Sequence, residues 1–130
     1  MTTRTGDLRF TEDHEWLRRE SDDVVVVGIT EHAQSQLGDL VYVQLPAVGA
    51  HYDAGAEMAV IESVKAAGDI KAPLPGTVVE VNSSLAEDPS KANSDPMNEG
   101  WFVKLRLDDR SRLASLMTAE AYSRLVQGEA

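Results

Sequence analysis

The chain of 130 residues contains no cysteine, which excludes disulfides, thiolate zinc sites and a cysteine nucleophile. The polypeptide also has no redox chemistry of its own, so electron transfer would need a bound or attached group. No apolar run approaches the roughly 20 residues of a membrane-spanning helix, and Met1–Arg9 lacks the apolar core of a signal peptide. We expect one domain over residues 1–130, with an ordered core at about 8–126.

Positive charge is also scarce. There are 12 Lys and Arg residues against 22 Asp and Glu residues, which gives a net charge of −10. Nucleic acid would repel a chain this acidic, so we expect no nucleic-acid partner. The acidic excess has two interpretations, which both stay open: it keeps the protein soluble, or it steers the protein toward partners with basic faces.

Motifs for catalysis and metal binding are missing. His14, His32 and His51 have no metal-ligand spacing, so we expect no metal site. The chain has no Gly-rich phosphate loop and no Gly-x-Ser-x-Gly turn. Ser63 stands near Lys65, but a hairpin tip offers no oxyanion hole to a Ser–Lys dyad. No catalytic residue is therefore predicted.

Lysine is rare, and one lysine has a distinctive setting. The four lysines are Lys65, Lys71, Lys91 and Lys104. Only Lys65 has small or hydroxyl-bearing neighbours on both sides, in the run Glu62–Asp69 between strand-like segments at 57–61 and 77–81. Strand, small-residue turn and strand predict a hairpin with Lys65 at its tip. An amine held there is a poor catalytic base, because nothing desolvates it enough to lower its pKa. The same amine is accessible to an enzyme that acylates it. The alternative is an unmodified, solvated lysine.

Other elements follow from local signals. Thr30 as N-cap and Gly38 as the stop predict a short helix over 31–37. Further strands are predicted at 24–29, 40–45 and 101–107, with a loop or short extended segment at 47–55 and a long loop at 82–100.

The C-terminal part changes to helical spacing. Leu113, Leu116 and Met117 predict one short helix. Thr118 can cap a second helix that ends at Gly128. We interpret these apolar stripes as packing; Trp16 and Trp101 are placed at the edge of the core.

A weak internal duplication supports two facing sheets. Gly38–Val43 resembles Gly76–Val81, and Gly55–Val60 loosely resembles Gly100–Leu105. The matching order of these repeats predicts a mainly β fold, either a pseudo-symmetric β-sandwich or a flattened barrel.

A series of short motifs carries a family resemblance. In chain order they are His14-Glu15-Trp16, Gly28–Gln34, Leu37-Gly38-Asp39, Leu45-Pro46, Glu62–Ala66, Asn93–Pro96 and Gly100-Trp101. This combination resembles the H protein of the glycine cleavage system, from about Leu8 to about Leu125. The resemblance implies a barrel-sandwich hybrid, with a short helix after the first core strand and helices at the C-terminus.

The resemblance also implies a function. Lys65 would carry lipoate in amide linkage, and the protein would be a carrier and not a catalyst. Its partners would be glycine decarboxylase with pyridoxal phosphate, aminomethyltransferase with tetrahydrofolate, dihydrolipoamide dehydrogenase, and the enzymes that attach lipoate. We expect a monomer in the bacterial cytoplasm, or in the mitochondrial matrix for a processed organellar form. The alternatives are a related carrier that donates lipoate to other acyltransferases or serves a sulfur-handling pathway, and an interaction module with an unmodified lysine.

A docking site for the loaded arm is implied too. Glu15 and Asp69 match the family's carboxylates for the cationic amine, and Ile29, Ala33 and Leu37 would form an apolar wall. The alternative is that Glu15 caps a turn and Asp69 accepts backbone hydrogen bonds. Local departures from the family pattern are Gly68, Lys71 and Met97-Asn98.

Overall fold

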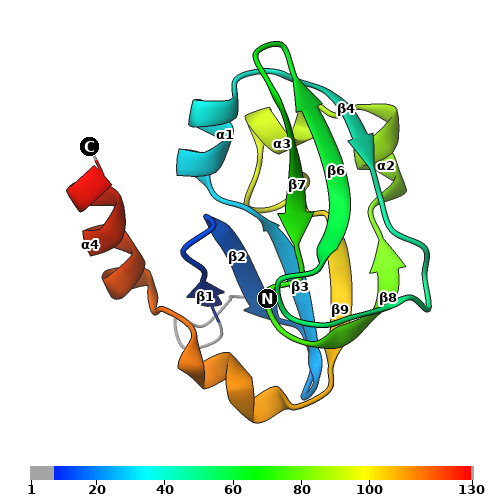
Figure 1. The fold of residues 1–130 in the computed structure, drawn as a ribbon, viewed down its shortest axis with the longest axis vertical. Helices are drawn as coiled ribbons and strands as arrows, with labels where there is room; N and C mark the ends of the chain where they lie inside the picture. The colour runs from blue at the N-terminus through cyan, green and yellow to red at the C-terminus, as the bar shows by residue number, and fades with distance from the viewer. Residues whose placement is uncertain (1–7, 130) are drawn as a thin grey trace.

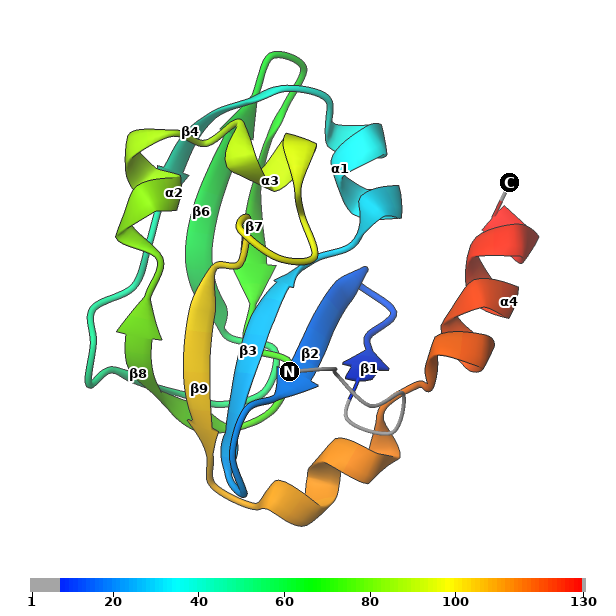
Figure 2. The same cartoon turned by 180° about the vertical axis from the view of Figure 1, so that it is seen from behind.

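The computed structural model describes residues 8–129, with the backbone alone at Glu129. Residues 1–7 and 130 of the predicted domain lie outside this range. Two antiparallel sheets face each other (Figures 1 and 2). The larger sheet runs in the order β1 (Leu8–Phe10), β2 (Glu15–Arg19), β3 (Val24–Ile29), β9 (Val103–Leu107), β8 (Gly76–Val81) and β5 (His51–Tyr52). The smaller sheet runs in the order β4 (Leu40–Gln44), β6 (Glu57–Ser63) and β7 (Ala67–Lys71).

Short helices surround the sheets. They are α1 (Glu31–Leu37), α2 (Ser83–Glu87), α3 (Lys91–Ser94), a 3₁₀ helix (Arg110–Ser115) and α4 (Ala119–Glu129). The β6–β7 hairpin projects past the other strands beside α1, while the 3₁₀ helix lies at the opposite end of the molecule (Figures 1 and 2). Residues 64–69 at the tip of this hairpin are exposed.

The main core fills the space between the sheets. From β3, Val25, Val27 and Ile29 point inward, and Ile61 and Ile70 meet them from the smaller sheet. The alternation along β3 follows from the two-residue period of a strand. This arrangement confirms the mainly β architecture of two facing sheets.

A second apolar cluster covers the outer face of the larger sheet. Its buried members are Phe10, Trp16, Val26 and Tyr122. Trp16 packs in this cluster, as its predicted packing role requires, but its side chain is fully buried and not at an edge, and its Nε1–H donates to the Pro96 carbonyl at 2.9 Å. Partly buried residues of α4, among them Leu125 and Val126, pack against this cluster together with Met97 and Trp101.

Local signals at α1 are confirmed. The helix spans Glu31–Leu37, the Thr30 hydroxyl accepts from the Ala33 N–H at 3.2 Å, and Gly38 ends it with φ at 78°. The Thr118 hydroxyl likewise accepts from the Ala121 N–H in the first turn of α4. The repeated segments at 38–43 and 76–81 contain β4 and β8, which lie in different sheets.

Four details differ from the sequence prediction. The strand paired with β6 is β7, whereas the segment predicted as its hairpin partner forms β8 in the other sheet. The predicted loop 82–100 contains α2 and α3, the last strand begins at Val103, and the helix predicted around residues 113–117 is the 3₁₀ helix at Arg110–Ser115.

Long-range hydrogen bonds explain the unexpected α3. The Asn93 side chain accepts from the Leu40 N–H at 2.9 Å and donates to the Gly38 carbonyl at 2.9 Å and to Gln34 Oε1 at 3.1 Å. A polar segment with weak helix preference is thus held against the end of α1 by tertiary contacts.

Candidate functional site

The tip of the β6–β7 hairpin is closed by the hydroxyl of Ser63. This oxygen accepts from the backbone N–H of Lys65 at 3.2 Å and of Ala66 at 3.0 Å, and it donates to the Ala66 carbonyl at 3.1 Å. The Ser63 N–H donates to the same carbonyl at 2.7 Å. The turn that presents Lys65 is therefore fixed, although its residues are exposed.

The tip is also tethered to the end of α1. The Val64 N–H donates to the Asp39 carbonyl at 3.0 Å. A Cβ added at Gly38 would lie 2.9 Å from Lys65 Cε and 3.7 Å from Lys65 Nζ. The stem of Lys65 therefore passes directly over Gly38. The sequence predicted Gly38 only as a helix stop; nothing in the local pattern revealed its contact with the lysine.

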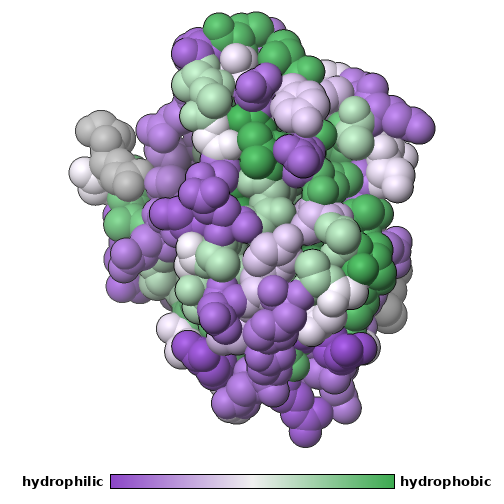
Figure 3. Space-filling view, turned by 45° about the vertical axis from the view of Figure 1, so that its right-hand side comes forward, coloured by the Kyte–Doolittle hydropathy of each residue, from purple (hydrophilic) through white to green (hydrophobic). Residues whose placement is uncertain are grey.

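Large apolar side chains are exposed on the smaller sheet and at the tip of its hairpin. Val64 exposes 67% of its surface, Val41 58%, Tyr42 45% and Val60 38%. Figure 3 shows hydrophobic surface gathered at the top of the molecule, where the hairpin ends. Acidic residues alternate with these side chains, because Tyr42 pairs with Glu62 and Val60 pairs with Asp69.

Glu15 is the buried acid of the site region. It exposes 2% of its surface at the start of β2. Burial raises the pKa of Glu15 to about 8, and the negative charge of Asp13 adds to the effect. The Thr11 hydroxyl, which donates to Glu15 Oε1 at 3.2 Å, and the Lys71 backbone N–H act in the opposite direction. At neutral pH the carboxyl is therefore mostly protonated.

A depression of about 310 Å³ opens beside this carboxyl. Its walls come from the turn before β2, the connection from β7 to β8, and the end of the 3₁₀ helix. The lining residues are Phe10, Thr11, Glu12, Asp13, Glu15, Gly55, Ala72, Pro73, Ser115, Leu116 and Met117. Glu15 thus lies at the end of β7 that is remote from the tip.

The other predicted docking residues occupy different environments. Ile29 pairs with Glu15 across the β2–β3 ladder and is buried, so it can form only the floor of a groove. Ala33 and Leu37 on α1 are half-buried and pack on the main core. Asp69 is exposed on β7. The structure brings Glu15 and Ile29 together and leaves Asp69 on the outer surface of the hairpin.

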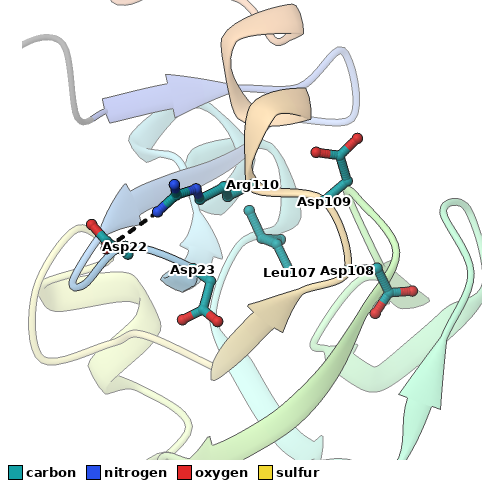
Figure 4. A pocket seen from close by; sticks show the side chains of 6 residues that line it. All are labelled: Asp22, Asp23, Leu107, Asp108, Asp109 and Arg110. Carbon is teal, nitrogen blue, oxygen red and sulfur yellow. Dashed lines mark ion pairs between the residues drawn. The ribbon is translucent and has the colours of Figure 1, made fainter.

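The opposite end of the molecule carries a second, acidic depression (Figure 4). Asp22, Asp23, Asp108 and Asp109 lie around it, and the Arg110 guanidinium pairs with Asp22 at 3.2 Å. Within residues 8–129, no group of three or more His, Asp or Glu side chains could hold a metal ion. No helix of the described chain is long and apolar enough to cross a membrane.

Comparison with known proteins decides the family. The model for "Glycine cleavage H-protein" matches residues 8–129. The chain belongs to the glycine cleavage H-protein family. A glycine cleavage system H protein of Edwardsiella ictaluri is 54% identical over 122 residues, which cover 94% of this chain and 95% of the relative. One from Coxiella burnetii is 47% identical over 129 residues, with 99% of each chain covered.

A solved structure agrees with the family assignment. The crystal structure of a glycine cleavage system H protein from Mycobacterium marinum superposes with a TM-score of 0.83 at 38% identity, and it covers 96% of this chain and 98% of the other. The predicted barrel-sandwich architecture and the non-catalytic carrier role are thus confirmed at the level of the family. The family is one of lipoate carriers that work with the other components of the glycine cleavage system.

Proposed function

We propose that Lys65 carries lipoate through an amide to its Nζ, and that the loaded protein moves the aminomethyl group of glycine between enzymes. The supporting observation is the presentation of Lys65, which is exposed at a fixed hairpin tip and has its stem laid over Gly38. An exposed primary amine can enter the site of a lipoate-attaching enzyme without unfolding. A turn closed by a hydroxyl and small side chains leaves room for that enzyme.

The attached dithiolane would supply the sulfur chemistry that the cysteine-free chain lacks: one sulfur accepts the aminomethyl group from glycine decarboxylase and the other becomes a thiol. Aminomethyltransferase would then pass the carbon to tetrahydrofolate with release of ammonia, and dihydrolipoamide dehydrogenase would reoxidise the dithiol. The chain itself presents the arm and exchanges no electrons. We place the protein in the bacterial cytoplasm as a monomer, because the relatives named above are bacterial and a swinging arm needs free surface.

Glu15 is proposed as the docking group for the cationic amine of the loaded arm. A neutral carboxyl can form an ion pair with a protonated amine only if it first releases its own proton to solvent. The pKa of about 8 makes this release inexpensive near neutral pH. The resulting ion pair would be sheltered, because Glu15 exposes 2% of its surface. Asp69, Ala33 and Leu37 would guide the arm from the tip toward this position.

Intact mass and reconstitution test the proposal. Wild-type protein treated with lipoate ligase, ATP and lipoate should gain one lipoyl group, mapped to Lys65 by peptide fragmentation. Lys65→Arg keeps the positive charge, but a guanidinium cannot form the amide, so this variant should gain no mass and should not support glycine decarboxylase. Lys71→Arg, on the same hairpin, is the matched control and should be modified normally. Full lipoylation of Lys65→Arg would refute the assignment, and modification without activity toward glycine decarboxylase would favour a different lipoyl carrier.

A further inference from the structure

The hydroxyl of Tyr122, on α4, contacts both the turn before β2 and the start of α1, two segments that lie next to Glu15. It lies 2.8 Å from His14 Nδ1 and 2.7 Å from Thr30 Oγ1. The Tyr122 ring stacks on Phe10, with centroids 4.6 Å apart and planes 8° from parallel. Tyr122 exposes 8% of its surface. A buried hydroxyl with two partners fixes the relative positions of the C-terminal helix, the turn before β2 and the start of α1.

His14, the residue before Glu15, has an unusual backbone. Its φ is 65°, and within the described chain it is the one residue other than glycine with a positive φ. Such a conformation persists only where neighbouring contacts enforce it. Here the Thr30 N–H donates to the His14 carbonyl at 3.0 Å, and the His14 N–H donates to the Thr11 carbonyl at 3.1 Å. The His14 side chain adds the contact with Tyr122.

The conformation of His14 sets the direction in which the chain enters β2. The next side chain, Glu15, points into the depression beside β7, where the hydroxyl of Thr11 and the charges of Asp13 and Lys71 face it. None of the described residues of α4 lines that depression. The ring of Tyr122 contacts Phe10, which lines the depression, whereas its hydroxyl can affect Glu15 only through its partners His14 and Thr30.

We propose that Tyr122 is a positioning residue for Glu15: its hydroxyl holds the His14 turn against the start of α1, and this keeps the Glu15 carboxyl in its buried place. The C-terminal helix thereby controls a docking site that it does not enter. The consequence for the loaded arm rests on the proposed function of Glu15. The positioning effect itself concerns the unmodified protein and can be measured without lipoate.

Tyr122→Phe isolates the hydroxyl, because it keeps the ring that stacks on Phe10. We expect the turn to loosen and water to reach Glu15, so that the pKa of its carboxyl, followed by ¹³C chemical shift in labelled protein, falls by about one unit. Tyr52→Phe is the matched control, since Tyr52 lies on β5 at the other edge of the larger sheet. It should leave the pKa of Glu15 unchanged.

Two variants at His14 test the same link between Tyr122 and Glu15. Asparagine tolerates positive φ and carries a polar group close to the backbone, so His14→Asn should keep the pKa of Glu15 near that of wild type. His14→Ala loses the side-chain contact and should follow Tyr122→Phe. Once lipoylated and loaded, Tyr122→Phe and His14→Ala should release ammonia or formaldehyde several-fold faster than Tyr52→Phe.

The outcomes separate positioning from simple packing. A Tyr122→Phe protein that melts at a lower temperature but keeps the pKa of Glu15 would overturn the inference, and so would equal effects of Tyr122→Phe and Tyr52→Phe. If Lys65 gains no lipoyl group, the proposed function fails. The pKa comparison on unmodified protein would still decide the role of Tyr122.

Discussion

Glu15→Gln should make the protein more stable, and increasingly so as the pH rises. The pKa of Glu15 is raised by burial from 4.5 to about 8, so the fold favours the protonated carboxyl. Glutamine has the same shape and carries no charge at any pH. Its amide oxygen can keep the hydrogen bond from the Thr11 hydroxyl.

The sign and size follow from proton linkage. Below pH 4.5, Glu15 is protonated in both the folded and the unfolded chain, and its contribution to the stability of the fold is fully present. As the pH rises toward 8, the unfolded chain loses the proton first, and wild-type stability falls by about 1.4 kcal/mol per pH unit. The free energy of unfolding of Glu15→Gln relative to wild type should therefore rise by about 4 kcal/mol between about pH 5 and pH 8. For a domain of this size, that corresponds to roughly 12 °C in Tm.

Thermal or urea unfolding of both proteins at several pH values measures this difference. Glu62→Gln is the matched control, because Glu62 is exposed on β6 and its removal should give a difference that hardly changes with pH. The pH-dependent contributions of the histidines, and of other groups that both proteins share, cancel when the stability of the variant is compared with that of wild type. If the difference between Glu15→Gln and wild type were the same at acidic and alkaline pH, Glu15 would not be a buried, protonated acid, and its proposed part in docking the amine would lose its basis.

Two further predictions concern the hairpin. Exchanging Lys65 with Ala66 turns the amine to the other side of the turn, and we expect a large loss of modification by a lipoate ligase or octanoyltransferase; equal rates of mass gain would contradict this. Gly38→Ala and Gly49→Ala both introduce a side chain at positive φ, at 78° and 94° respectively, but nothing lies within 4 Å of the new Cβ at position 49. Each should cost about 1 kcal/mol of stability, whereas only Gly38→Ala should slow lipoylation, because its methyl group displaces the stem of Lys65. Similar rates in the two variants would show that Gly38 serves the backbone alone.

Local chemistry in the sequence predicted the elements that carry their own signals. The cap at Thr30 and the stop at Gly38 define α1, and the β-branched run at 24–29 defines β3. The pairing of β6 with β7 is not predicted, because the sequence analysis assigns the strand after the lysine to 77–81 and not to Ala67–Lys71. The segment containing α3 reads as a loop until the three hydrogen bonds of Asn93 are known.

The candidate site likewise has one feature that the local sequence predicts and others that only the fold reveals. The setting of Lys65 among small residues is visible in the sequence because it is local, and the hairpin places it as expected. The state of Glu15 is not local. Its pKa depends on the desolvation that packing in the fold produces and on contacts with Thr11, Asp13 and Lys71. The contact of the His14 side chain is with Tyr122, 108 residues later in the chain.

The hairpin tip combines exposure with a fixed shape, and a carrier protein needs both. An enzyme that modifies or reads the arm must reach Lys65 without unfolding the protein, so the tip cannot be covered. It must also find the amine in a constant place, and a lysine in a flexible loop would lose conformational entropy in every complex. The hydrogen bonds of the Ser63 hydroxyl and the bond from Val64 to Asp39 restrict the tip before any partner arrives. The side chain of Lys65 and whatever it carries can thus move while these hydrogen bonds restrain the backbone of the turn.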